Sequence, residues 1–186
     1  MSEPVSSVLG ASFHGFATVR DLGPLGMITL RAKADTPGLA AAVQAATGCA
    51  LPGVRRILRS GARAAGWMSP DEYLLVLPYA EVSGALAAIA DAMQGQHHLA
   101  VDVSDARAVF RIEGPKADQV LRKLMPVDFD RLEPNELRRS RAAQVAAAIW
   151  AEEGGFALVC FRSVAGYVRG LLTTSAQPGS ELTPGV

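Results

Sequence analysis

The residues in this sequence best suited to metal binding or to proton transfer near neutral pH are three histidines, His14, His97 and His98. His97 and His98 are adjacent, at a predicted junction between a helix and a strand. No cysteine or carboxylate accompanies them at the spacing that zinc sites use. We therefore expect no metal ligand in this chain.

The sequence lacks the short motifs that bind nucleotides or activate a serine nucleophile. Gly61 and Gly66 have the spacing of a phosphate-binding loop, but the Lys and Ser or Thr that complete such a loop do not follow Gly66. The pattern predicts neither a phosphate loop nor a dinucleotide fingerprint. We expect no cofactor-binding residue in this chain.

Two pairs of acidic residues could in principle perform general acid–base catalysis. Glu152 and Glu153 fall at a predicted turn, and Asp128 and Asp130 in a polar loop. Carboxylates in such places are usually solvated, so we interpret all four as surface residues. With no convincing nucleophile or base beside them, we expect no catalytic residue.

Arginines form two clusters, one at Arg55, Arg56, Arg59 and Arg63 and one at Arg138, Arg139 and Arg141. They are either charged faces of edge strands, where charge discourages unwanted strand pairing, or the rim of a subunit contact or an anion site. A subunit contact is favoured over an anion site. Aromatic residues usually belong to the core, but half-exposed ones anchor interfaces. The candidate interface residues are Trp67, Tyr73, Arg55, Arg56, Arg59, Arg138 and Arg139.

The composition restricts the class of partner. Eighteen basic and eighteen acidic residues balance, which argues against a nucleic-acid or anionic-membrane partner, because both need a concentrated positive field. No apolar run approaches the roughly 20 residues that span a bilayer, and the N-terminus has no secretory signal. Cys49 and Cys160 fit two buried thiols in a reducing compartment. We expect a cytoplasmic protein.

The elements that must position these residues are organised around residues 99–124. Alternating apolar residues predict a strand at 99–103 and another at 107–112, separated by the turn residues Ser104 and Asp105. Gly114 and Pro115 end the second strand and lead into a helix with an apolar stripe. This stretch defines a fold and contains no chemistry of its own.

The same periodicities predict the other elements. Strands are expected at 27–33, 54–60, 62–68, 74–77, 141–151 and 156–162. Helices are expected after Asp35, over 82–93 and after a capping Ser163. The order predicts an α+β fold, with antiparallel sheets and helices packed on one side. We divide the chain into an N-terminal arm at 1–26, a domain at 27–174 with two loosely related halves at about 27–96 and 97–174, and a flexible tail at 175–186.

Several motifs, taken in order and spacing, resemble the gamma subunit family of heterotetrameric sarcosine oxidases. They are Trp67-Met68-Ser69-Pro70-Asp71-Glu72-Tyr73-Leu74-Leu75, Val101-Asp102-Val103-Ser104-Asp105-Ala106-Arg107, Gly114-Pro115-Lys116-Ala117 and Pro126-Val127-Asp128, with the strand from Phe156 to Ser163 running into Ala165-Gly166-Tyr167. The resemblance covers about residues 25 to 174. The strand, Gly-Pro step and helix are also similar to the wider aminomethyltransferase family, which includes the folate-binding T-protein of glycine cleavage.

The T-protein resemblance implies an α+β fold with antiparallel sheets, and it does not carry over folate chemistry. This chain is about half as long as a full T-protein. Asp102 and Asp128 match that family's catalytic aspartate by residue type alone.

The gamma subunit resemblance implies a non-catalytic structural subunit. The complex would demethylate sarcosine oxidatively to glycine, with release of hydrogen peroxide and transfer of a one-carbon unit to tetrahydrofolate. FAD, FMN, NAD and tetrahydrofolate would bind to partner subunits, and this chain would dock among alpha, beta and delta subunits, mainly on alpha. The alternatives are a free-standing folate-binding or aminomethyltransferase-like protein, the equivalent subunit of an N-methyl amino-acid dehydrogenase, and an anion-binding module.

Overall fold

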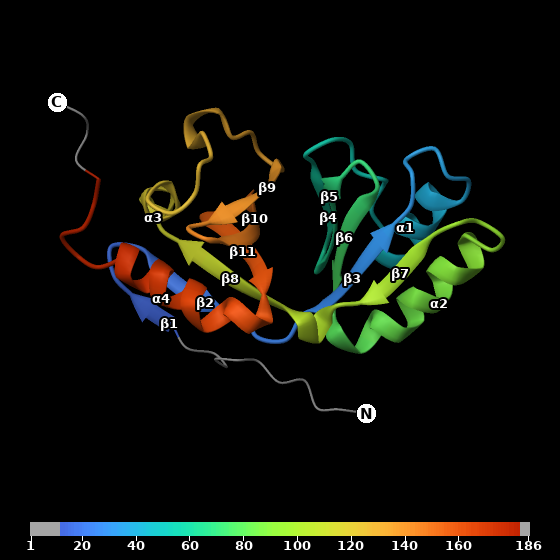
Figure 1. Ribbon diagram of the computed structural model, residues 1–186, viewed down its shortest axis with the longest axis horizontal. Helices are drawn as coiled ribbons and strands as arrows, with labels where there is room; N and C mark the ends of the chain where they lie inside the picture. The colour runs from blue at the N-terminus through green and yellow to red at the C-terminus, as the bar shows by residue number, and fades with distance from the viewer. Residues whose placement is uncertain (1–11, 183–186) are drawn as a thin grey trace. The chain divides into compact units, whose positions relative to one another are not determined.

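A computed structural model describes residues 12–182 of the chain (Figure 1). These residues form two compact units, each built on one antiparallel sheet. Unit 1 contains residues up to 23, 106–134 and from 138 onward, and unit 2 contains residues 24–105 and 135–137. The predicted α+β class with antiparallel sheets is confirmed.

Unit 2 has a five-stranded sheet in the order β4-β5-β6-β3-β7, so β4 and β7 are its edges. Its strands are β3 (Gly26–Arg31), β4 (Ile57–Ser60), β5 (Arg63–Ser69), β6 (Glu72–Leu77) and β7 (Leu99–Asp102). Its helices are α1 (Leu39–Thr47) and α2 (Val82–Ala92), the second preceded by a 3₁₀ turn at Tyr79–Glu81.

The core of unit 2 lies between its sheet and the two helices, which pack against each other on one face (Figure 1). Alternate strand residues such as Ile28, Leu30 and Leu75 face this core and are almost fully buried. Val43 from α1 and Ile89 from α2 meet them. This is the pattern that a period of two in the strands and a helical stripe produce together.

Helix α1 begins at Gly38 instead of at the predicted cap, Asp35, and no side chain caps it. Gly38 has a φ of 83°, and a Cβ there would lie 2.2 Å from the carbonyl oxygen of Ala92. Only glycine therefore allows the start of α1 to approach the end of α2 this closely. Gly48, in a left-handed conformation, ends the helix.

Unit 1 has a six-stranded sheet in the order β1-β2-β8-β11-β10-β9. Its strands are β1 (Ser12–His14), β2 (Thr18–Asp21), β8 (Arg107–Glu113), β9 (Leu137–Ala142), β10 (Val145–Glu152) and β11 (Gly155–Phe161). Its helices are α3 (Ala117–Arg122) and α4 (Ala165–Ser175), with 3₁₀ turns at Phe129–Arg131 and Arg162–Val164. A further 3₁₀ turn at Ser104–Ala106 lies where the chain passes from unit 2 to unit 1.

The core of unit 1 also lies between a sheet and two helices. Phe110 of β8 and Leu158 of β11 are fully buried, and Val120 of α3 and Val168 of α4 pack in the same cluster. Phe129 stands edge-on to Phe156, with ring centroids 5.6 Å apart. The central stretch of the sequence thus supplies the middle strand of this unit and its first helix.

The ends of the chain differ from their predicted descriptions as arm and tail. Residues 12–21 form two strands, and β2 pairs with β8 in the register Val19↔Ile112. Ala176 is fully buried, and the backbone amide of Leu182 donates to Gln119 Oε1 at 2.9 Å. Residues 12–23 and 175–182 therefore belong to unit 1, residues 24–26 belong to unit 2, and the rest of each segment lies outside the described residues.

The predicted halves at 27–96 and 97–174 also differ from the two units. β7 completes the sheet of unit 2, and β1 and β2 join the sheet of unit 1. Residues 135–137 belong to unit 2 although both flanking segments belong to unit 1. Pairing between strands distant in sequence decides this division, and local periodicity does not report such pairing.

Two local predictions were wrong. The strand expected over 141–151 is broken by a turn at Ala143, whose φ is 49°, so β9 and β10 are separate strands. Helix α4 begins at Ala165 after Val164, and Ser163 does not cap it. An alanine in a left-handed turn carries no sequence signal, and the 3₁₀ turn before α4 replaces the predicted serine cap.

Candidate functional site

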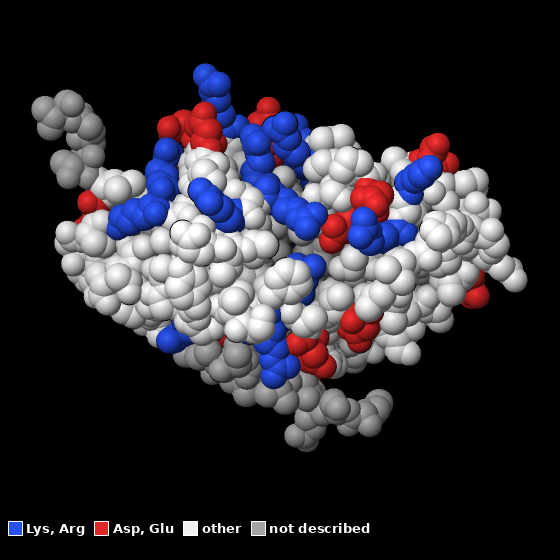
Figure 2. All heavy atoms as spheres, viewed as in Figure 1, with Lys and Arg blue, Asp and Glu red and all other residues white. Residues whose placement is uncertain are grey.

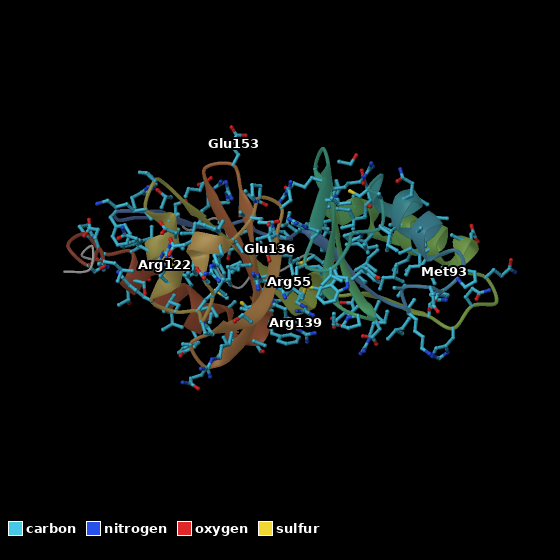
Figure 3. The ribbon with its side chains drawn as sticks, turned by 90° about the horizontal axis from the view of Figure 1, so that it is seen from above. Arg55, Met93, Arg122, Glu136, Arg139 and Glu153 are labelled. Carbon is cyan, nitrogen blue, oxygen red and sulfur yellow. The ribbon has the colours of Figure 1, made fainter. Side chains whose placement is uncertain are left out.

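The first arginine cluster lies at edge strand β4 of unit 2, where two of its members fasten another segment. Arg55 has a φ of 58° and pairs with Glu136 at 3.9 Å, and Figure 3 labels both residues. Arg56 forms an antiparallel bridge with Glu136, and the amide of Leu137 donates to the carbonyl of Arg55 at 2.8 Å. The Glu136 side chain is only 9% exposed. Arg55 and Arg56 therefore have a structural role in holding residues 135–137.

The remaining arginines of the predicted interface set lie on edge strands. Arg59 is exposed on β4. Arg139 is exposed and Arg138 half-buried on β9, the edge of the six-stranded sheet in unit 1. Figure 3 labels Arg139 on that strand. Arg59 and the second cluster thus lie on edge strands, Arg55 and Arg56 lie just before β4, and Arg63 lies on the inner strand β5. This agrees in large part with their interpretation as charged edges and leaves the subunit-contact role a prediction.

The two aromatic candidates face each other across β5 and β6. Tyr73 pairs in register with Trp67 and is 1% exposed, and both rings belong to the core beneath the helices of unit 2. Burial raises the pKa of the Tyr73 hydroxyl. Trp67 is half-buried. Tyr73 is consequently a core residue, and its assignment to a docking surface is corrected here.

An ion-pair network that the sequence gave no reason to expect lies at one end of the unit 1 sheet. The Arg111 side chain is 8% exposed, and it pairs with Glu152 at 2.9 Å and with Glu113 at 3.3 Å. It also donates to the carbonyl oxygen of Glu153, which Figure 3 labels. Trp150 Nε1 donates to Glu152 at 2.7 Å. The pair Glu152–Glu153, predicted to be solvated, therefore holds a buried arginine.

The second acidic pair also takes part in structural contacts. Arg122 of α3, labelled in Figure 3, contacts Asp130 through two nitrogens, at 2.6 and 3.1 Å, and Asp118 at 2.9 Å. Hydrogen bonding to Arg122 holds the pKa of the Asp130 carboxyl below its usual value. Asp128 accepts a hydrogen bond from the Asp130 amide and so begins the 3₁₀ turn. These carboxylates fix the loop that follows α3.

Neither cysteine is placed as a nucleophile. Cys160 is 1% exposed in the core of unit 1, and burial raises the pKa of its thiol to about 11. A thiol with that pKa stays protonated at neutral pH and is a poor nucleophile. Cys49 is buried in unit 2, where its thiol contacts the carbonyl of Leu58 at 3.4 Å.

A pocket of about 830 Å³ lies in unit 2, where β3 ends and β7 begins. It brings together His97, His98 and charged residues from two other segments, 31–37 and the turn at Asp71, a grouping that the sequence did not suggest. The Arg31 guanidinium donates to Asp71 at 2.7 Å, and both side chains line the pocket. The lining residues are Arg31, Ala32, Lys33, Asp35, Thr36, Pro37, Asp71, Gln96, His97, His98 and Leu99.

Charged residues of both signs are interspersed on the face shown in Figure 2, and the surface over α4 is largely uncharged. Tyr167 is 47% exposed on that helix. Within residues 12–182, no group of three or more His, Cys, Asp or Glu side chains is placed to hold a metal ion. No helix in the same residues is long and apolar enough to cross a membrane.

The chain matches a family described as sarcosine oxidase, gamma subunit family, over residues 31–176. Two curated relatives are sarcosine oxidase gamma subunits. The one from Arthrobacter sp is 31% identical over 148 residues, which cover 75% of this chain and 69% of that protein. The one from Corynebacterium sp. (strain U-96) is 36% identical over 134 residues, which cover 70% of this chain and 62% of that protein.

Two solved structures share the fold. A chain of the heterotetrameric sarcosine oxidase from Corynebacterium sp. U-96, determined with pyrrole 2-carboxylate, matches with a TM-score of 0.80 and 25% identity, over 94% of this chain and 91% of that one. The aminomethyltransferase T of the glycine cleavage system from Bartonella henselae matches with a TM-score of 0.64 and 14% identity, over 85% of this chain and 45% of that one. The second match is evidence of a shared fold alone.

Proposed function

This chain belongs to the sarcosine oxidase gamma subunit family, and from that membership we propose that it is a structural subunit, without an active site of its own, of a heterotetrameric sarcosine oxidase. The observation that carries the proposal is the match over nearly the whole length of both chains to a chain of such an oxidase. The partners are the alpha, beta and delta subunits, with the main contact on alpha.

The geometry of the polar residues supports a structural role. Arg111, Arg122 and the carboxylates around them engage one another in ion pairs that fix loops and strand ends. Catalytic groups, in contrast, usually have pKa values tuned toward the working pH in an accessible cleft. Cys160 has a pKa shifted away from that range and is buried.

The reaction of the assembled complex follows from the same proposal. The complex oxidises the N-methyl group of sarcosine, so that glycine is released, oxygen is reduced to hydrogen peroxide, and the one-carbon unit passes to tetrahydrofolate. FAD, FMN, NAD and tetrahydrofolate bind to the partner subunits. This chain contributes folded surface against which they pack.

The test is co-expression of the tagged chain with the other subunits, followed by affinity purification. We expect fixed stoichiometry, a yellow preparation with flavin absorbance, and oxygen consumption with sarcosine. The chain expressed alone should be colourless, and tetrahydrofolate should not raise its melting temperature. A colourless chain that elutes alone from the co-expression would refute the subunit assignment, and thermal stabilisation by tetrahydrofolate would favour a free-standing folate-binding protein.

A further inference from the structure

The pocket at the end of β3 has the size of a small-molecule site. Its volume is about 830 Å³, and ligand pockets usually measure about 300–1,000 Å³. Three segments of unit 2 form its wall, which are residues 31–37 after β3, Asp71 before β6, and residues 96–99 at the start of β7. The pocket therefore lies wholly within one unit.

Backbone contacts fix these three segments relative to one another. The amide of Ala32 donates to the carbonyl of Asp71 at 3.1 Å, which joins the first segment to the second. Arg31 lies opposite Leu99 in the register of β3 and β7, which joins the first segment to the third. A wall held in this way is largely preformed, so a ligand orders little of the chain when it binds.

Two of the four charges on the wall neutralise each other. Arg31 donates to one oxygen of Asp71 at 2.7 Å, and the Ser69 hydroxyl donates to the other oxygen at 3.0 Å. Hydrogen bonding to Arg31 also holds the pKa of the Asp71 carboxyl below its usual value. Arg31 and Asp71 together therefore add polarity to the wall and no net charge.

The other two charges, Lys33 and Asp35, stay separate. Both side chains are exposed on the wall, and within residues 12–182 neither of them forms a hydrogen bond or an ion pair. The wall thus presents one cation and one carboxylate that do not satisfy each other. A ligand that carries both an anionic and a cationic group complements this arrangement, whereas a ligand with a single charge is attracted by one residue and repelled by the other.

His98 adds a hydrogen-bond acceptor to the same wall. Its Nδ1 lies 3.0 Å from the carbonyl oxygen of Gln96, which can only accept, so Nδ1 carries the proton and Nε2 of the neutral ring is left as an acceptor. An ammonium group has three donors, so it can use this acceptor in addition to a carboxylate. Leu99, which is 53% exposed, and Pro37 supply apolar surface for the rest of a ligand.

We propose that this pocket binds a zwitterionic α-amino acid with an apolar side chain. Lys33 pairs with its carboxylate, Asp35 and His98 accept hydrogen bonds from its ammonium group, and Leu99 and Pro37 contact its side chain. The site goes beyond the proposed function, which assigns the cofactors to partner subunits. It does not depend on assembly of the complex.

The test is titration of the isotope-labelled full chain with L-leucine, followed by the amide signals in NMR spectra. We expect saturable shifts at residues 31–37 and 96–99 with a dissociation constant of about 1 mM. Isoamylamine lacks the carboxylate of leucine, isocaproate lacks its ammonium group, and glycine lacks its side chain. Each of these three should bind at least about threefold more weakly than leucine.

Two neutral variants assign the charges. Lys33→Gln should weaken binding of leucine and isocaproate by about threefold and leave isoamylamine unchanged, and Asp35→Asn should weaken leucine and isoamylamine and leave isocaproate unchanged. Lys116→Gln and Asp91→Asn are the matched controls, at exposed charges outside the pocket, and should change none of these affinities. The melting temperature of all four variants should stay within about 2 °C of the wild-type value, because surface substitutions without contacts have little effect on stability.

Absence of saturable shifts up to about 20 mM leucine would overturn the proposal. Shifts scattered outside the pocket, or affinities that Lys33→Gln and Asp35→Asn leave unchanged, would overturn it as well, since they would indicate non-specific binding. Equal affinity for leucine and glycine would overturn the apolar contact. None of these results bears on the subunit assignment, which co-expression with the other subunits tests separately.

Discussion

Replacement of Arg111 tests the buried network of unit 1 most directly. In Arg111→Met, Glu152 and Glu113 lose the arginine that both contact, and the carbonyl of Glu153 loses a donor. Breaking a buried ion pair by removal of one partner typically costs about 3–5 kcal/mol. Glu152 and Glu113 remain 20% and 35% exposed and keep hydrogen bonds from Trp150 and Arg20, which favours the lower end.

We therefore expect Arg111→Met to lower the free energy of unfolding by about 3 kcal/mol, equivalent to a decrease in melting temperature of about 6–12 °C for a chain of this size. Urea unfolding followed by tryptophan fluorescence measures this loss of stability. A Trp67→Phe background leaves Trp150 of unit 1 as the remaining tryptophan, so the signal reports on unit 1. Combination with Glu152→Gln should show a coupling energy of about 1–3 kcal/mol.

Arg20→Met is the matched control. Arg20 contacts the same Glu113 at 3.1 Å but is 45% exposed, so its loss should cost less than about 1 kcal/mol. Equal costs for Arg111→Met and Arg20→Met would refute the reasoning, because burial would then have no influence on the strength of this network.

Three further predictions concern other parts of the chain. Lys123→Met removes hydrogen bonds to the carbonyls of Ser175 and Ser180, and should cost about 2 kcal/mol and speed amide exchange over 176–182. Gly155→Ala would place a Cβ 2.0 Å from the carbonyl oxygen of Ile112. It should lower the free energy of unfolding, measured by chemical denaturation, by about 3 kcal/mol or more. A decrease of less than about 1 kcal/mol would contradict this close packing. The pKa of the Asp130 carboxyl is lower in the folded chain than in the unfolded chain, where it is about 4. The ionised carboxylate therefore stabilises the fold above about pH 4, and this stabilisation is lost as the pH falls through the lower pKa of the folded chain. Asp130→Asn should accordingly flatten the decline in melting temperature at acid pH.

Local periodicity predicted the elements whose residues alternate or repeat clearly. The stripe through Val82, Ile89 and Met93 gives α2, and the apolar run at 74–77 lies in β6. The sequence did not predict β1 and β2. β2, with the sequence Thr-Val-Arg-Asp, is short, and its partner strand β8 lies about 90 residues further along the chain. Pairing between strands that are far apart in the sequence leaves no signal in the local pattern of residues.

The sequence predicted which residues belong to the candidate site better than it predicted the role of each residue. Most of the clustered arginines lie on or beside edge strands, as the charged-edge interpretation predicts, but Arg63 lies on the inner strand β5. Tyr73 is buried because its position in β6 alternates toward the helices, whereas the turn before it suggested the surface. Arg111 occupies a polar position of the alternating pattern in β8, and its burial depends on Glu152 from the hairpin β10–β11 beside it as well as on Glu113 of its own strand.

The interleaving of the two units along the chain has a consequence for synthesis on the ribosome. All five strands and both helices of unit 2 are complete once residue 105 has left the exit tunnel, and only residues 135–137 of the unit arrive later. β1 and β2, which emerge first, must wait for β8, and the sheet of unit 1 closes only after β11 has been made. Nascent chains should therefore gain protease resistance in unit 2 well before the N-terminal strands gain it.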